Sequence, residues 1–241
     1  MTKYKYEVFI KGETVDLVIP NKNAIETDQW NSWFNDKEKM QFLPEHAMFP
    51  NTKKDQYLRL NKMVEMNKNR KGLFLLIKPK NTDFVIGVTS LSVINWKSNS
   101  AFLSIIIGSR KKSKDFIFWA FETKALMASH AFDQLGLQKV YGNQNMNLSE
   151  WQKYSLLLGF YPEGIRIRAI KKAQNYFDVI EHACLYEDYL KIKKKNNGNL
   201  WPGKEKFFNL MKKFPKENIY KQIQNENKKY IQSYLKKIYN K

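Results

Sequence analysis

The sequence predicts an α/β domain of alternating strands and helices, with a basic helical extension at its C-terminal end. Two observations lead to this prediction. Up to Tyr186, short runs of β-branched and aromatic residues alternate with longer runs of helical apolar spacing. From Lys191 onward the chain becomes Lys-rich and its apolar residues follow helical spacing. We therefore expect a domain over residues 1–190 and an extension over residues 191–241.

The first half of the chain predicts five strands and two helices. A strand pair is expected at Tyr6–Ile10 and Val15–Ile19, around a turn at Gly12. Thr27 and Thr52 each precede a run of helical apolar spacing, so both are expected to cap a helix. An antiparallel meander of three strands, joined by polar turns, is expected at residues 73–77, 84–94 and 101–107.

The second half of the domain predicts a cationic loop, two helices and three more strands. The loop follows Gly108 and contains Arg110, Lys111, Lys112 and Lys114. A helix is expected from Phe116 to Leu135, followed by a strand, a helix and a final hairpin at residues 139–143, 149–158 and 165–186. Because the N–H groups at a helix N-terminus favour anions, a cationic loop in this place suits a ligand that carries phosphate.

The extension predicts a linker and two helices. A solvated linker is expected at residues 191–199, before the turn residues Trp201, Pro202 and Gly203. The apolar stripes at residues 207–214 and 219–238 are too rich to stay in water, so these helices are expected to pack on the domain or on a second subunit. The second case would give a homo-oligomer. A membrane-surface or nucleic-acid role for the same helices is the alternative.

The composition restricts the class of protein. The chain of 241 residues has a formal charge of +19, but its basic residues include only five Arg, so nucleic acid is not the expected partner. No apolar run approaches the ~20 residues of a membrane span, and the first residues lack the apolar core of a signal peptide, which predicts a cytoplasmic protein. Cys184 is the single cysteine and is expected in a buried strand. No metal-ligand spacing is present, so no metal is expected.

Five segments in register resemble the GNAT superfamily of acyl-CoA-dependent N-acetyltransferases, in the branch of ribosomal-protein and nucleotide-sugar acetyltransferases. These segments are Lys11–Leu17, Trp30–Asp36, Ile86–Leu91, Ser100–Phe160, and Glu163-Gly164 followed by Tyr176–Val179. The resemblance implies the GNAT fold, an α/β fold with a mixed, mostly antiparallel central sheet flanked by helices. In this fold two parallel strands splay apart where cofactor and acceptor meet. The resemblance also implies acetyl-CoA as co-substrate and an acetyl transfer to the primary amine of a small acceptor.

The resemblance further implies roles for named residues. Backbone N–H groups at Ile105 and Ile107 would stabilise the oxyanion, and Asn147 would hold the pantetheine arm. The family's acid for the leaving thiolate is often a Tyr at the position of Ser155. Tyr154 lies one residue away, about 100° around a helix, and is our candidate for that role, with a core tyrosine as the alternative. The four loop cations named above would contact the phosphates of CoA.

The resemblance implies that the two opening helices and the loop between them wall the acceptor pocket. Trp33, Asn35 and Asp36 are the candidate contacts there, with core packing as the alternative for Trp33 and a helix-ending turn for the other two. Trp96 lies in a turn and is a candidate to cover a ligand or a dimer partner. A nucleotide-linked amino sugar is the preferred acceptor because of resemblance at residues 33–36 and 86–90. A protein N-terminus is the alternative acceptor.

One departure from the family affects cofactor binding. The family's cofactor loop carries glycines that let the backbone approach the phosphates, but here those places hold Phe116 and Phe118, or Lys114 and Phe116 in a gapless alignment. One hypothesis is that cationic side chains replace the lost amides, with both Phe side chains turned into the core. The other is a binding module of GNAT fold that has lost acyl transfer.

No general base is assigned from the sequence. The three histidines form no cluster along the chain, and three carboxylates at family positions are expected to be structural. The histidines are His46, His130 and His182, and the carboxylates are Glu122, Glu163 and Asp178.

Overall fold

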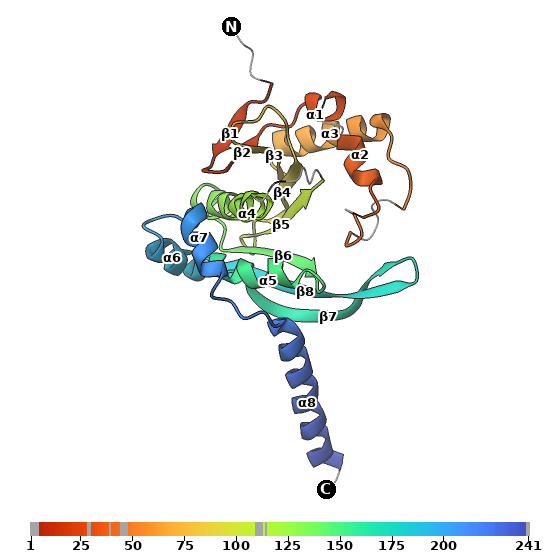
Figure 1. The fold of residues 1–241 in the computed structure, drawn as a ribbon, viewed down its shortest axis with the longest axis vertical. Coiled ribbons are helices and arrows are strands. Elements are labelled where there is room, and N and C mark those ends of the chain that lie inside the picture. Colours follow the sequence, from red (N-terminus) through yellow and green to blue (C-terminus); the bar gives the residue numbers. More distant parts are fainter. Residues whose placement is uncertain are drawn as a thin grey trace.

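The structure, a computed structural model, describes residues 5–27, 30–38, 40–43, 48–108, 113 and 115–239. Within these residues one sheet of eight strands has the order β1-β2-β3-β4-β5-β6-β8-β7 (Figure 1). Strands β5 and β6 run parallel, and every other neighbouring pair in the described sheet is antiparallel. The expected mixed, mostly antiparallel sheet is therefore confirmed.

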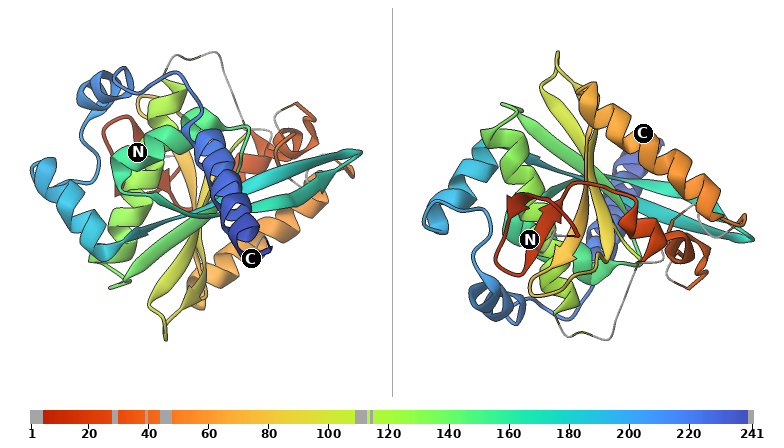
Figure 2. Two further views of the ribbon diagram at one scale, coloured as in Figure 1. Left: turned by 90° about the horizontal axis from the view of Figure 1, so that it is seen from below. Right: turned by 90° about the horizontal axis from the view of Figure 1, so that it is seen from above.

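The first five strands are neighbours in sequence and in space, as expected for a meander. They are β1 (Val8–Lys11), β2 (Val15–Val18), β3 (Leu73–Pro79), β4 (Gly87–Asn95) and β5 (Ser100–Ile107). Among the described residues, three helices come between β2 and β3, namely α1 (Asn23–Glu26), α2 (Trp30–Asn35) and α3 (Lys53–Lys68). Figure 2 shows α3 and α4 (Phe116–Asp133) on opposite sides of these strands. The two faces of the sheet thus bury two apolar cores, as in a three-layer α/β domain.

The two expected helix caps have different outcomes. Thr52 caps α3, because its hydroxyl accepts from the Asp55 N–H at 3.2 Å while the Asp55 carboxylate accepts from the Thr52 N–H at 2.8 Å. Thr27 was expected to begin a helix but ends α1 instead, where its hydroxyl donates to the Asn23 carbonyl at 2.8 Å. The side chain of Asn21 accepts from the Asn23 N–H at 3.0 Å and starts this short helix.

Helix α4 is the centre of the larger core. Its apolar stripe is buried against β5, α5 (Ser149–Ser155) and the C-terminal helices, and includes Phe121, Ala125, Ala128 and Phe132. Glu122 lies on the same helix, and burial raises the pKa of its carboxyl group despite hydrogen bonds from the turn between β1 and β2. Its carboxylate accepts from the backbone N–H groups of Glu13, Thr14 and Val15. The expected structural role of Glu122 is confirmed.

The remaining strands end in a long hairpin. They are β6 (Lys139–Asn145), β7 (Tyr161–Lys172) and β8 (Asn175–Leu185), and a 3₁₀ turn, η1 (Leu156–Leu158), joins α5 to β7. The final hairpin is confirmed and closes with Ala173 and Gln174. Cys184 is buried on β8, as expected.

The extension differs from expectation at its start. Residues 191–195 were expected in a solvated linker, but α6 (Tyr186–Lys195) continues through them. The reason lies at Tyr189, which is buried, stacks on Phe132 and donates to the Asp133 carboxylate at 2.6 Å. Lys193 pairs with the same carboxylate at 2.9 Å. Because these contacts hold a Lys-rich segment on the core, it stays helical.

Two further helices complete the chain. Helix α7 (Lys204–Met211) packs on α4 through Phe207, whereas α8 (Ile219–Tyr239) projects away from the body (Figure 1). Among the helices that the structure describes, none combines the length and the apolar character that crossing a bilayer requires.

Candidate active site

The parallel strands β5 and β6 separate along their length. They pair only at Ser100–Lys139, Ala101–Val140 and Phe102–Tyr141. Gly142 still lies close to β5, since a Cβ added there would be 2.9 Å from the Leu103 carbonyl oxygen. Beyond this point the described strands diverge, and a gap opens at their C-terminal ends, as the family resemblance implied.

The backbone of β5 faces this gap at alternate residues. The Ser104 carbonyl accepts from the Thr89 hydroxyl at 3.0 Å, and the Gly108 N–H donates to the Ile86 carbonyl at 2.9 Å, so both groups point toward β4. Neighbouring residues of a strand direct their backbone groups to opposite sides. The N–H groups of Ile105 and Ile107 therefore point into the gap.

A cavity of about 380 Å³ fills the gap and is bounded by β5, β6, the start of α4, α5 and the loop after α2. Most of its wall is apolar and comes from Met40, Phe42, Leu43, Ile105, Ile106, Ile107, Phe116, Ile117, Ala120, Phe121, Leu148 and Trp151. Three polar side chains complete the lining, and these are Gln144, Asn147 and Glu150. An apolar cleft with a few convergent polar groups is typical of a small-molecule site.

Gln144 is the polar side chain whose hydrogen bonding is incomplete. Its Oε1 atom is buried and has no hydrogen-bond partner among the described residues. A buried acceptor of this kind costs about 1–3 kcal/mol unless a ligand or water donates to it. Its place in the cavity wall leaves this acceptor available to a ligand.

Glu150 is the carboxylate of the cavity wall. It pairs with Lys153 at 2.7 Å and accepts from the Tyr154 hydroxyl at 2.5 Å. Burial raises its pKa, but the bonds from Lys153 and Tyr154 outweigh burial, and the net pKa is lowered. Glu150 is therefore ionised at neutral pH, which makes it an attractive partner for a cation and a weak base.

Tyr154 lies behind this carboxylate. Burial, followed by the hydrogen bond to Glu150, raises the pKa of its hydroxyl to about 12. The side chain is 9% exposed, and its ring packs against Phe121 and Phe214. The hydroxyl is directed to Glu150, and Tyr154 is not part of the described cavity wall.

A buried polar cluster lies on the inner side of α5. Lys124 Nζ donates to the Ser155 hydroxyl at 2.8 Å and lies 3.2 Å from His182 Nε2. Burial lowers the pKa of Lys124 to about 7, and burial followed by the charge of Lys124 lowers the pKa of His182. Ser155, at the place of the family's usual tyrosine, also donates to the Trp151 carbonyl at 2.8 Å. Its hydroxyl is thus engaged within the core.

Comparison with known families identifies the domain. Residues 22–148 match the family described as Acetyltransferase (GNAT) domain, which is more than half of the chain. The chain belongs to the GNAT acetyltransferase family. No curated protein sequence matches it.

Solved structures share the fold of this GNAT domain. The spermidine N-acetyltransferase from Vibrio cholerae, in complex with CoA and spermine, is 18% identical with a TM-score of 0.63, and the match covers 74% of this chain and 99% of that one. The ribosomal-protein-S5-alanine acetyltransferase from Vibrio fischeri is 17% identical with a TM-score of 0.64, over 76% and 99% of the two chains.

A third GNAT structure is that of the microcin C7 self-immunity acetyltransferase MccE in complex with acetyl-CoA and AMP. It is 18% identical with a TM-score of 0.60, and the match covers 72% of this chain and 93% of that chain. At these identities the likeness concerns the fold.

The structure brings together some of the residues expected from the sequence. Ile105, Ile107 and Asn147 all line the cavity of the GNAT domain. The loop cations Arg110, Lys111, Lys112 and Lys114 lie outside the described residues, as does His46. The two aromatic residues at the family's glycine positions differ from each other. Phe118 is buried in the core as expected, whereas Phe116 lines the cavity.

The residues expected to contact the acceptor do not line the described cavity. Trp33 is 4% exposed and packs against Gly108, where any Cβ would clash with its side chain. The amide of Asn35 donates to the Asn51 carbonyl at 2.9 Å, and its carbonyl accepts from the Asn51 N–H at 2.7 Å, so it holds the chain before α3. Asp36 directly follows α2 and is outside the described cavity wall.

Trp96 lies at the far end of the meander. It is 55% exposed in the turn before β5, whereas the cavity lies at the opposite end of that strand. Five residues of strand separate Ser100 from Ile105, the first β5 residue of the cavity wall, which corresponds to about 17 Å. Trp96 is therefore not part of the described cavity wall.

Sequence reasoning missed Gln144 and Glu150. Both lie within three residues of Asn147. A polar residue at the end of a strand, just before a turn that carries a candidate site residue, was a sequence pattern that pointed to Gln144. Within the described residues no group of three His, Cys, Asp or Glu side chains is placed to hold a metal ion.

Proposed function

We propose that this GNAT domain transfers an acetyl group from acetyl-CoA to the primary amine of a small acceptor. The observation that carries the proposal is the gap between β5 and β6, where the N–H groups of Ile105 and Ile107 point into a cavity of about 380 Å³. Two directed backbone donors in an apolar cleft suit the oxyanion that forms when an amine attacks a thioester.

The residues present fit the acyl and pantetheine end of acetyl-CoA. The free edge of β5 offers backbone groups to the amides of the pantetheine arm, much as a neighbouring strand would use them. Gln144 Oε1 supplies a buried acceptor that lacks a partner among the described residues, and Asn147 lies beside it on the cavity wall. The match to MccE, solved with acetyl-CoA, supports the same co-substrate.

The phosphate end of the co-substrate would lie at the start of α4. We propose that Arg110, Lys111, Lys112 and Lys114 contact the phosphates there, since the chain lacks the family's loop glycines. The burial of Phe118 leaves the first turn of α4 anchored in the core while the loop cations precede it. Affinity carried by such cations falls steeply with added salt, which distinguishes it from binding by directed amides.

The chemistry follows from these positions. The bound ammonium ion first loses one proton to solvent. The free amine nitrogen then forms a bond to the acetyl carbon, the carbon–sulfur bond breaks, the nitrogen loses a second proton and the thiolate gains one. Ile105 and Ile107 stabilise the oxyanion. The ionised Glu150 attracts the acceptor as an ammonium ion and orients it toward the gap. Because its pKa is lowered, we assign Glu150 to binding and not to proton removal.

We propose a nucleotide-linked amino sugar as the acceptor, on the resemblance at residues 33–36 and 86–90. Trp33 and Asn35 are occupied by internal contacts, so direct acceptor contacts would come from the cavity wall. A polyamine and a peptide with a free N-terminal alanine are the competing acceptors, since the spermidine and ribosomal-protein enzymes share the fold. Comparison of kcat/KM across these three acceptors, by release of free thiol, decides between them.

The test of co-substrate binding is calorimetry with acetyl-CoA on two matched variants of β6. Gln144→Ala removes the unpaired cavity acceptor, and Asn143→Ala makes a similar change at the exposed residue next to it. We expect Gln144→Ala to raise the dissociation constant for acetyl-CoA about fivefold, because one hydrogen bond worth about 1 kcal/mol is lost. Asn143→Ala should leave this constant unchanged. Absence of binding by the wild type at millimolar acetyl-CoA would favour the binding module that has lost acyl transfer.

A further inference from the structure

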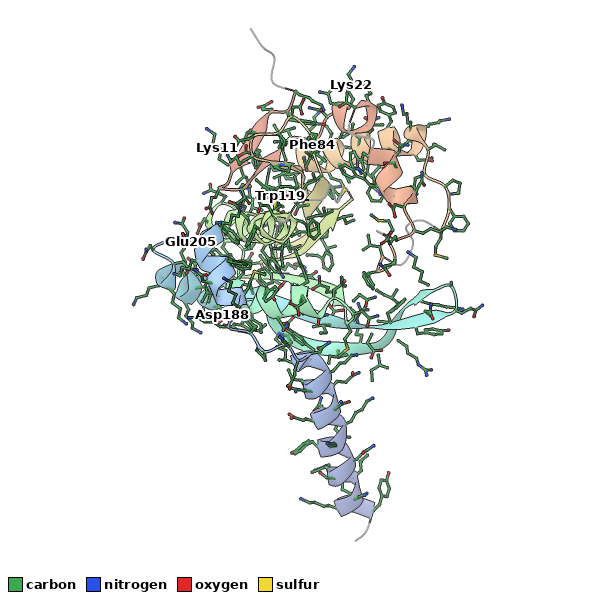
Figure 3. All side chains as sticks on the ribbon, in the orientation of Figure 1. Lys11, Lys22, Phe84, Trp119, Asp188 and Glu205 are labelled. Atoms are coloured by element: carbon green, nitrogen blue, oxygen red, sulfur yellow. The ribbon has the colours of Figure 1, made fainter. Side chains whose placement is uncertain are left out.

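Helix α8 carries an apolar face that the described part of the chain leaves uncovered. Its first turn is attached, because Tyr220 is buried with Met146 and Ile180, and Gln224 donates to the Asp178 carboxylate at 3.1 Å. Every residue from 225 to 239 is exposed, and the side chains of this part extend away from the body (Figure 3). At 1.5 Å per residue, the free part of α8 is about 22 Å long.

Six exposed apolar side chains of α8 share one side of the helix. At 100° per residue they fall within an arc of about 140°, and Tyr239 lies outside it. The members of this arc are Ile223, Tyr230, Ile231, Tyr234, Leu235 and Ile238, all at least 43% exposed. In the free part of the helix, Asn227 is the only polar residue inside the arc. A helix of this length is marginal in water by itself, so a partner for the arc would stabilise it.

The charge of α8 identifies the kind of partner. The helix contains five Lys and one Glu. Lys228 borders the apolar arc on one edge and Lys237 on the other, while Lys229 and Lys236 lie behind it. Long Lys side chains at these borders can extend past an apolar surface and place their ammonium groups among anions.

We propose that the free part of α8 binds an anionic lipid surface and lies in the plane of that surface. The arc would enter the boundary between headgroups and acyl chains, with tyrosines at the interface and the bordering lysines on lipid phosphates. A second copy of α8 fits less well, since pairing would bring two helices of net charge +4 together and the arc is broader than a coiled-coil seam. Nucleic acid would pair with the lysines but leave the arc in water.

The test is sedimentation of the full chain with vesicles. One set contains phosphatidylglycerol and phosphatidylcholine in equal parts, and the other contains phosphatidylcholine alone. Two variants are compared, each with two serines introduced into α8. Ile231→Ser with Ile238→Ser changes the apolar arc, and Asn225→Ser with Gln232→Ser changes the polar side. All four positions are exposed, so the fold of the body is not affected.

We expect at least tenfold tighter binding of the wild type to the anionic vesicles than to the neutral ones. The arc variant should lose at least tenfold, and the polar-side variant should stay within twofold. The proposal is overturned by equal binding to both vesicle types, by no binding, or by equal loss in both variants. It is also overturned if light scattering without lipid gives a dimer mass that the arc variant abolishes, or if only an RNA duplex binds and the arc variant does not weaken it.

Discussion

Helices α7 and α8 are similar in character but have opposite surroundings. Both are Lys-rich and amphipathic, yet Phe207 of α7 is fully buried whereas every residue of α8 beyond Gln224 is exposed. Polar contacts hold the start of α7. Glu13 accepts from the Trp201 indole N–H at 2.7 Å and from the Lys204 N–H at 2.9 Å, at the point where α7 begins. Amphipathic spacing alone therefore does not decide whether a helix joins a core.

The aromatic contacts of α7 extend to the centre of the domain. The Phe207 ring lies 5.1 Å from that of Phe121 on α4 and 4.9 Å from that of Trp201. Phe121 in turn stacks on Trp151 at 4.3 Å, and both line the cavity. One layer of aromatic rings thus connects α7 to the cavity wall. No such layer is found along the free part of α8.

The largest expected effect is the loss of an aromatic ring from α7. We expect Phe207→Ala to lower the free energy of unfolding by about 3–5 kcal/mol, because the cavity left beside Phe121 and Trp201 is closed on all sides. Tyr234→Ala on α8 is the control and should change it by less than about 0.5 kcal/mol, since Tyr234 is 58% exposed. Urea unfolding measures both. Equal losses would mean that α8 is also packed in solution.

Much of the fold was predictable because it depends on local patterns. The meander, α4 and the last hairpin each follow from periodicity that tertiary contacts reinforce, and Thr52 with Asp55 is a cap that the sequence itself specifies. Helix α6 was missed because it depends on Asp133, which is more than 50 residues away in sequence from Tyr189. Long-range polar contacts of this kind leave no local pattern.

The candidate site was predictable in its backbone but less in its side chains. Ile105, Ile107 and Asn147 were implied by the family resemblance, and all three line the cavity. Trp33 and Asn35 have the residue types of a binding site, but Gly108 and Asn51 already occupy them. Gln144 and Glu150 can be identified as site residues only from the structure, because the divergence of β5 and β6 places both on the cavity wall. Residue type indicates chemistry, whereas contacts decide whether it is available.

The next effect compares a buried lysine with an exposed one. Burial lowers the pKa of Lys124 on α4 to about 7, whereas the unfolded chain has a lysine pKa near 10.5. Between these values the unfolded state binds one more proton, so this group makes stability rise with pH by up to about 1.4 kcal/mol per unit. The penalty for charging Lys124 is fully present below pH 7 and absent above pH 10.5.

Two variants test this pH dependence. Lys124→Met should remove the contribution of this lysine to the rise of unfolding free energy with pH. The difference in unfolding free energy between variant and wild type should therefore shrink as the pH rises from 7 to 10. Lys229→Met on the exposed part of α8 should give a difference that does not depend on pH. Urea titrations at each pH supply the values. A flat difference for Lys124→Met would show that the buried ammonium is stabilised by other groups.

The smallest effect is expected where the two helices join. The Phe214 ring contacts that of Tyr154 at 5.7 Å, and Lys153 donates to the Pro215 carbonyl at 3.0 Å, so the junction of α7 and α8 rests on α5 beside Glu150. The Tyr154 hydroxyl orients Glu150 without reaching the described cavity wall. Lys153 would still hold Glu150 after loss of that hydroxyl.

We therefore expect Tyr154→Phe to raise the KM of the amine acceptor about threefold and to keep kcat within twofold, a loss below 1 kcal/mol. Tyr189→Phe removes the same kind of bond, to Asp133, far from the cavity and should change neither constant. Steady-state kinetics on both variants decides the role of Tyr154. A fall in kcat of a hundredfold with unchanged KM would make its hydroxyl the acid for the leaving thiolate, because loss of a proton donor acts on the chemical step and not on acceptor binding.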